Sequence, residues 1–160
     1  MILLDTNLLG RMTDSSDPQC AIARNAVHGL LGRRERLVIV PQNLYEFWAV
    51  ATRKAGPLPA GQNGLGMTCE QAGQWLDFFQ RRFTLLTDRT ELLGRWRSLV
   101  GSFAVKGIKS YDVRLVAAMQ TYGVTRLLTF NGSDFKSYPI TIIDPNSISL
   151  RLLPSPTPPA

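Results

Sequence analysis

Five short, largely apolar runs recur along the chain, and the first four are separated from one another by longer stretches with helical spacing. The runs cover residues 1–5, 37–40, 83–86, 126–130 and 140–143. Strands that are apolar along their length, rather than at every second position, are typical of a sheet buried on both faces. Strands that alternate with helices pair in parallel, because the helix supplies the crossover connection. The sequence therefore predicts a three-layer α/β/α fold around a five-stranded parallel sheet.

Signals at helix ends indicate five helices between these strands. Asp17 can cap a helix that begins at about Pro18, and Thr68 with Gln71 has the spacing of a capping box. The expected helices cover about 18–31, 43–54, 68–79, 88–103 and 110–122, the last of them capped by Ser110. Glycines and prolines crowd the stretch 55–66 and predict a long loop there.

The composition is that of a globular chain and favours a polyanionic partner. With 160 residues, 44% hydrophobic and 19% charged, the chain suits one domain over 1–150 and a disordered, proline-rich tail over 151–160. A net charge of +6 attracts nucleic acid at long range, although scattered basic pairs are more typical of an ordinary solvated surface. No apolar stretch approaches the ~20 residues that span a bilayer. Residues 1–5 lack the basic start of a signal peptide, so the expected location is the cytoplasm.

Four acidic residues stand where predicted elements end or begin on one side of the sheet. They are Asp5, Glu46, Asp112 and Asp134. Each has a simpler explanation: Asp5 can be a helix N-cap, and Asp134 can be a turn residue. Asp112 can complement a helix dipole, and Glu46 can form a buried ion pair with Arg53 or another arginine. The helix of Glu46 is apolar almost all round, so a carboxylate there is expected to be buried and costly unless it has a partner.

A parallel sheet brings such acids together, because the carboxyl ends of its strands meet at one edge. Carboxylates at close range raise one another's pKa and cannot all stay ionised without compensation. A divalent cation relieves the repulsion, and Mg²⁺ prefers oxygen ligands. The one histidine, His28, lies in the first long helix, so a histidine-based mechanism has little to work with. The sequence therefore predicts a Mg²⁺ site built from carboxylates.

Four segments resemble, in order, the acidic motifs of PIN-domain ribonucleases, particularly toxins of the virulence-associated protein C (VapC) type. The segments are 2–7, 43–46, 111–117 and 128–135. The resemblance implies an endoribonuclease that uses Mg²⁺ or Mn²⁺, forms a homodimer and is inhibited by a cognate antitoxin. It also implies that the four acids are catalytic and hold the metal, with Thr6, Thr129 and Asn131 orienting ligands or water. Some members have an acid in place of Asn131, so Asp134 can be a direct ligand or reach the metal through water.

Basic residues near such a cleft would have to hold the RNA, because carboxylates alone repel phosphates. The candidates are Arg11, Lys106, Lys109 and Arg114, and ordinary surface charge is an equally good explanation for any one of them. Tyr111 can stack on an unpaired base, but a core position is the favoured expectation.

Other functions stay open on the sequence alone. A PIN-like module can bind RNA or a protein without cleaving, although acids at all four positions argue against it. A structural subunit would use the wide apolar helix faces that carry Trp48, Trp75 and Trp96, which core packing explains equally well. A phosphatase of the haloacid-dehalogenase type needs an acid where Asn7 stands. A receiver domain needs a lysine closing the fifth strand, where the chain has Asp144.

Overall fold

The computed structural model describes residues 1–56 and 63–148, which form five strands and six helices with two short 3₁₀ helices. In chain order the elements are β1 (Ile2–Leu4), α1 (Thr6–Thr13), α2 (Cys20–Gly32), β2 (Leu37–Ile39), α3 (Pro41–Thr52), α4 (Cys69–Arg82), β3 (Thr84–Leu85), α5 (Glu91–Ser102), α6 (Lys109–Tyr122), β4 (Arg126–Leu128), η1 (Gly132–Phe135), β5 (Thr141–Ile143) and η2 (Pro145–Ser147).

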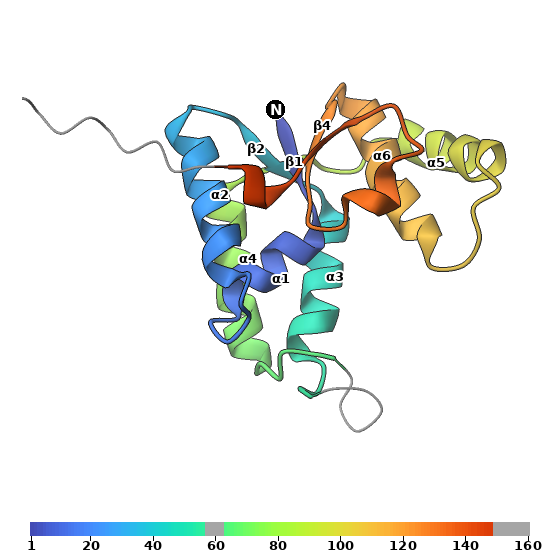
Figure 1. Cartoon of the computed structure of the whole chain (residues 1–160). Helices are drawn as coiled ribbons and strands as arrows, with labels where there is room; N and C mark the ends of the chain where they lie inside the picture. Colours follow the sequence, from blue (N-terminus) through green and yellow to red (C-terminus); the bar gives the residue numbers. More distant parts are fainter. Residues whose placement is uncertain (57–62, 149–160) are drawn as a thin grey trace, which may run out of the picture.

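The five strands form one parallel sheet in the order β3-β2-β1-β4-β5, with β1 at its centre (Figure 1). The predicted α/β fold and its five-stranded parallel sheet are therefore confirmed. The register pairs Leu4 of β1 with Leu128 of β4, so the residues that follow, Asp5 and Thr129, leave the sheet side by side. The backbone N–H of Asp5 donates to the carbonyl oxygen of Leu128 at 3.0 Å and extends this pairing to the edge of the sheet.

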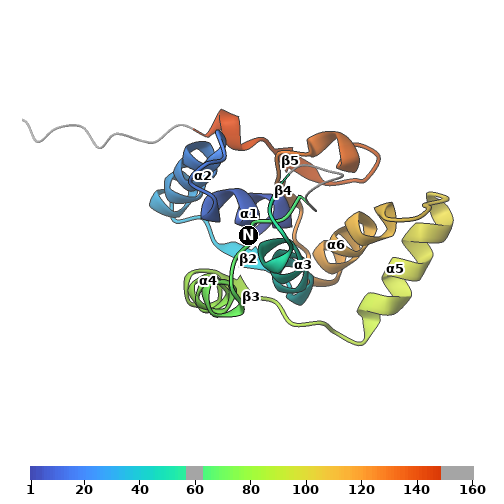
Figure 2. The ribbon, with the colours of Figure 1, turned by 90° about the horizontal axis from the view of Figure 1, so that it is seen from below.

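Alternate residues of each strand enter two separate cores, because successive side chains of a strand point to opposite faces. Ile2 and Leu4 pack with α1, α2, α3 and α4, whereas Leu3 packs with α5 and α6. Figure 2 shows α5 and α6 on one side of the molecule, with α2 and α4 on the other. The apolar runs are thus explained by helices on both faces, which form the outer layers of the predicted three-layer fold.

Helix α1 was not predicted from the sequence, and several predicted helix starts are wrong, including that of α5, which begins at Glu91 rather than Asp88. Helix α3 begins at Pro41 rather than Asn43, because proline fits the first position of a helix, where no N–H is needed. Ser110 does not cap α6, since that helix begins at Lys109 with Ile108 at the N-cap.

The capping box of α4 is confirmed, with Thr68 accepting from the N–H of Gln71 at 3.1 Å and donating its own N–H to Oε1 of Gln71 at 2.9 Å. Asp17 does not cap α2 directly, because the helix begins only at Cys20. Its carboxylate instead accepts the N–H of Gln19, the N-cap residue.

Only the flanks of the predicted 55–66 loop lie within the described residues, where Ala55 and Gly64 form an isolated parallel bridge. Residues 57–62 and the predicted tail over 151–160 lie outside them. In the part of the chain that is described, no helix is long and apolar enough to cross a membrane.

The first prediction concerns Gly132, which begins the 3₁₀ helix that carries Asp134. A Cβ atom added at Gly132 would lie 2.8 Å from Cγ2 of Ile142 in β5, which is too close for two carbon atoms. Gly132→Ala should therefore lower the free energy of unfolding by about 1–3 kcal/mol, as overpacking does elsewhere. Urea unfolding of the purified protein measures this change.

Gly94 in α5 is the matched control, because it is exposed and an added Cβ would meet no heavy atom within 4 Å. Gly94→Ala should raise the free energy of unfolding by roughly 0.5–1 kcal/mol, since alanine favours the helix. A Gly132→Ala protein as stable as the wild type would show that η1 tolerates the extra methyl group.

Candidate active site

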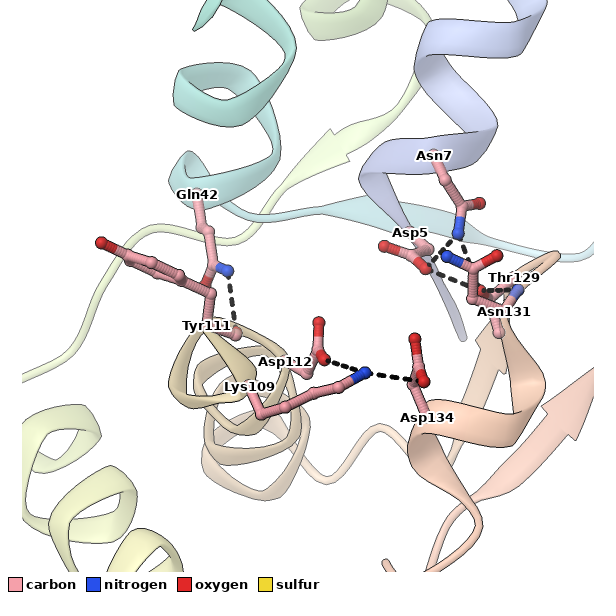
Figure 3. A network of polar contacts seen from close by, with 9 residues as sticks. All are labelled: Asp5, Asn7, Gln42, Lys109, Tyr111, Asp112, Thr129, Asn131 and Asp134. Atoms are coloured by element: carbon pink, nitrogen blue, oxygen red, sulfur yellow. Dashed lines mark hydrogen bonds and ion pairs between the residues drawn. The ribbon is translucent and has the colours of Figure 1, made fainter. Parts of the chain in front are cut away.

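The four predicted acids converge beyond the carboxyl ends of β1 and β4. Asp5 follows β1 directly, Glu46 lies on α3, Asp112 in the first turn of α6, and Asp134 on η1 (Figure 3 shows all but Glu46). The negative charges of Glu46 and Asp112 raise the pKa of Asp5, and those of Asp134 and Glu46 raise the pKa of Asp112. The carboxylates of four distant segments therefore share one electrostatic environment.

Asp5 is the most buried member of the group, with 8% of its surface exposed. Its Oδ2 accepts hydrogen bonds from the Thr129 hydroxyl at 2.6 Å and from the Asn7 amide at 2.7 Å. Burial raises the pKa of Asp5 from 3.8 to about 6, and the hydrogen bond from Thr129 only partly opposes this effect. The two side chains that donate to Asp5 among the described residues, Thr129 and Asn7, are neutral, so they stabilise its charge without neutralising it.

Glu46 is also held by neutral donors rather than by an arginine. The Thr6 hydroxyl donates to its Oε2 at 2.6 Å, and the Gln42 amide donates to its Oε1 at 2.7 Å. Gln42 is itself fixed, since its amide also donates to the Tyr111 carbonyl and its oxygen accepts from Arg114 at 3.0 Å. The ion pairs among the described residues include none between Glu46 and an arginine.

Asn43 links the end of β1 to the start of α3, and its side chain is fully buried. Its amide donates to the Leu4 carbonyl at 3.1 Å and to Oγ1 of Thr6 at 3.2 Å, while its oxygen accepts the N–H of Val40 at 2.8 Å. No role was predicted from the sequence for the side chains of Gln42, Asn43 and Asn7. The spacing of Gln42 and Glu46 by four residues is the one signal that could have revealed a pair on one helix face.

Lys109 lies between the two remaining acids. Its Nζ is 2.7 Å from Oδ1 of Asp134 and 3.6 Å from Oδ2 of Asp112, as Figure 3 shows. Burial raises the pKa of Asp112, and the ammonium of Lys109 acts in the opposite direction. The hydrogen bond to Asp134 is the largest cause of a raised pKa at Lys109.

The supporting residues predicted from the sequence surround Asp5 and Glu46. Thr6 and Thr129 donate to these carboxylates, as described above. The backbone N–H of Asn131 donates to Oγ1 of Thr129 at 2.9 Å, which places Asn131 next to the same group. Thr129 therefore joins the Asp5 carboxylate to the turn that follows β4.

The four predicted RNA-binding cations occupy different surroundings. Lys106 is exposed in the segment before α6, and Lys109 bridges two acids. The guanidinium of Arg11 lies over the ring of Phe130, 4.7 Å from its centroid. Arg114 forms an ion pair with Asp88 in addition to its contact with Gln42, so its charge is already compensated.

Two expectations about burial are wrong. Tyr111 is 57% exposed rather than packed in the core. Helix α3 is not buried on most sides, because Tyr45, next to Glu46, is 69% exposed. Glu46 also lies in the second turn of α3, since the helix begins at Pro41, so it does not complement the dipole of the first turn.

The donor chemistry of the site fits a hard divalent cation. The acids offer only oxygen ligands, and none of them forms an ion pair with an arginine within the described ranges. A cationic group, the ammonium of Lys109, already stands between Asp112 and Asp134. Over residues 1–56 and 63–148 no three acidic, histidine or cysteine side chains are close enough to hold one ion as they stand. His28 is an exposed residue of α2.

No family model and no curated protein matches the sequence, but solved structures match the fold. VapBC2 of Rickettsia felis, bound to a promoter DNA fragment, is 19% identical, with a TM-score of 0.63 over 90% of this chain and 98% of that one. VapC20 of Mycobacterium tuberculosis, a toxin that cleaves the sarcin–ricin loop, is 15% identical, with a TM-score of 0.63 over 88% and 97%. FitAcB of Neisseria gonorrhoeae is 14% identical, also with a TM-score of 0.63, over 91% and 98%.

The fold is that of a PIN domain. The resemblance to VapC-type toxins is thus confirmed for the fold, over nearly the full length of each matched chain. The four acids lie at the carboxyl edge of the sheet in this PIN-like fold.

The second prediction concerns the buried charge of Asp5 when no divalent metal is present. A pKa raised from 3.8 to about 6 means that the folded protein binds this proton more tightly than the unfolded chain does. The ionised form therefore lowers stability above pH 6, and this penalty is removed as the pH falls through 6 towards 3.8. Asp5→Asn should raise the free energy of unfolding by up to about 3 kcal/mol near pH 7.5 and by almost nothing near pH 4.

Urea unfolding in EDTA at both pH values measures the difference. Asp77→Asn is the control, because Asp77 is an exposed carboxylate on α4 and its removal should change stability little at either pH. A wild-type protein more stable than Asp5→Asn near pH 7.5 would show that the hydrogen bonds to Asp5 outweigh the cost of its burial.

Proposed function

We propose that this chain is a cytoplasmic, metal-dependent endoribonuclease that hydrolyses RNA phosphodiester bonds. We further propose that it is the toxin of a type II toxin–antitoxin pair, with a cognate antitoxin and a homodimeric state. Solved structures of the same fold support this assignment, since they include toxin–antitoxin complexes and one toxin that cleaves the sarcin–ricin loop.

One observation carries the proposal: four carboxylates converge, and the described side chains that donate hydrogen bonds to two of them, Asp5 and Glu46, are all neutral. A carboxylate that serves only structure is commonly matched by an arginine or lysine, because an uncompensated buried charge costs free energy. Here the negative charge of the pair stays available to a cation. Such an arrangement suits metal binding better than it suits packing.

Asp5, Glu46 and Asp112 would hold the ion, with Asp134 as a fourth ligand or as a residue that orients water. A divalent cation bound there supplies an activated water and neutralises charge on the phosphate that is attacked. Hydrolysis of this kind needs no nucleophile from the protein. This fits the surroundings of Asp5 and Glu46, where the donating side chains are amides and hydroxyls.

The neutral donors set the direction of each carboxylate. Thr129 and Asn7 fix Oδ2 of Asp5, while Thr6 and Gln42 each bind one oxygen of Glu46. Donors of this kind orient metal ligands in other proteins, and their loss typically reduces activity about 10- to 100-fold. Their role here is to fix the orientation of the Asp5 and Glu46 carboxylates.

RNA phosphates would be held around the acids rather than by them. Lys106 is exposed near the start of α6, and Arg11 lies above Phe130, beside the end of β4. Arg114 is better explained as a residue that positions Glu46. It donates a hydrogen bond to Gln42, and Gln42 in turn donates to the Glu46 carboxylate.

The third prediction is that the wild-type protein cleaves a mixed pool of RNA in the presence of Mg²⁺ or Mn²⁺ and not in EDTA. Asp5→Asn should reduce the rate about 100-fold or more, since a neutral amide is a poor metal ligand. Asp77→Asn, which removes an exposed carboxylate of α4, should retain the wild-type rate. Initial rates from gel electrophoresis of the cleaved RNA measure these differences.

Folding of each variant is checked by circular dichroism, so that a lost rate is not mistaken for a lost fold. Equal cleavage by Asp5→Asn would remove the metal-site proposal. A wild-type protein that binds RNA without cutting it would favour the non-cleaving PIN-like module.

The fourth prediction concerns the role as a toxin. Induced expression of the wild-type chain in a bacterial host should arrest growth, because an uninhibited endoribonuclease depletes essential RNA. Asp5→Asn expressed to the same level should allow normal growth, as judged by optical density and immunoblotting. Normal growth with an enzyme that is active in vitro would reject the toxin role and leave the nuclease in place.

A further inference from the structure

Lys109 joins two acids that come from different parts of the fold. Asp112 lies one turn along the same helix, and a pair at that spacing is worth little on an exposed surface. The shorter contact, 2.7 Å, reaches across to Asp134 on η1. The ammonium thus connects α6 to η1.

The ammonium stands where the carboxylates of Asp112 and Asp134 would also attract a divalent cation. It bridges Asp112 and Asp134, whose charges repel each other and raise the pKa of Asp112. A positive group at this position relieves that repulsion. Two cations cannot share the position, because they would repel each other and compete for the same oxygens.

The Lys109 ammonium is also able to move away from Asp112 and Asp134. Half of its side chain, 52%, is exposed, and its flexible stem can turn the ammonium to solvent without disturbing the core. Asp112 and Asp134 are only 31% and 32% exposed and are tied to a helix and a 3₁₀ helix. The lysine is therefore the mobile member of the trio.

We propose that Lys109 is the built-in counter-ion of Asp112 and Asp134, and that a divalent cation must displace it in order to bind. This inference rests on the proposed function, because it assumes that the site takes a metal. Without a metal, Lys109 holds Asp112 and Asp134 together. Because the ion has to displace the ammonium, its affinity for the site is weakened. Once displaced, the ammonium remains beside the site as a free positive group for an RNA phosphate.

The fifth prediction is tested by Mn²⁺ binding to the purified full chain, measured by calorimetry without RNA. Lys109→Met should tighten the Kd for Mn²⁺ about tenfold, because it removes the competing charge and keeps the length of the side chain. Lys109→Arg retains the charge and should bind Mn²⁺ no more tightly than the wild type. Lys106→Met removes an equal charge three residues away and should change the Kd by no more than about twofold.

Thermal unfolding separates competition from a merely structural role. In EDTA, Lys109→Met should have a lower Tm than the wild type, because Asp112 and Asp134 lose their counter-ion. In saturating Mn²⁺ the order should be reversed or the difference lost. A structural salt bridge would instead lower the Tm by a similar amount in both conditions.

Each outcome bears on a different claim. An unchanged or weaker Kd for Lys109→Met overturns the proposal, and so does equal tightening in Lys106→Met, which would show a general effect of charge. If neither the wild type nor any variant binds Mn²⁺, the proposed nuclease function fails together with the inference. If the wild type binds Mn²⁺ and Lys109→Met binds it equally well, only the inference fails.

Discussion

The Asp5 carboxylate is held in the interior at the end of the central strand, and the rest of the site is arranged around the cost of burying it. Asp5 directly follows β1, beside the residue that follows β4, and only 8% of its surface is exposed. Hydrogen bonds from Thr129 and Asn7 stabilise the charge, but the pKa still rises to about 6. A buried acid that remains so far from its ordinary pKa is incompletely compensated. A positive charge close to Asp5 would supply the missing compensation. The negative charges of Glu46 and Asp112 nearby make the binding of such a charge still more favourable.

The neutral network also explains how the fold keeps several acids aligned. Thr6 donates to Glu46 and accepts from Asn43, which in turn binds the last carbonyl of β1 at Leu4. The same amide accepts the N–H of Val40, just before α3. One side chain therefore fixes the spacing between the central strand and the helix that carries Glu46. Movement of either element would leave buried polar groups without partners, at a cost of about 1–3 kcal/mol each.

Most of the fold and the location of the acids could be predicted from the sequence, because both follow from local pattern. Continuous apolar runs need two covered faces, and parallel strands place their carboxyl ends at one edge. The amides of Gln42 and Asn43 could not be assigned, since their roles depend on carbonyls and hydroxyls that are distant in the chain. Exposure of Tyr45 and Tyr111 was missed for a related reason. Helical spacing shows which residues share a face and not whether another element covers that face.

Charge is distributed unevenly between the site and the rest of the chain. The chain has 12 acidic residues, and four of them meet at this one edge, whereas 18 lysines and arginines give the whole chain a net charge of +6. The net positive charge of the chain attracts a polyanion towards the molecule at long range. The clustered carboxylates repel the same polyanion at close range. The ammonium of Lys109 offsets part of that repulsion at Asp112 and Asp134, but it leaves Asp5 and Glu46 without a cationic partner among the described residues. If a divalent cation binds as proposed, it would supply the further positive charge that a phosphate needs in order to approach Asp5 closely.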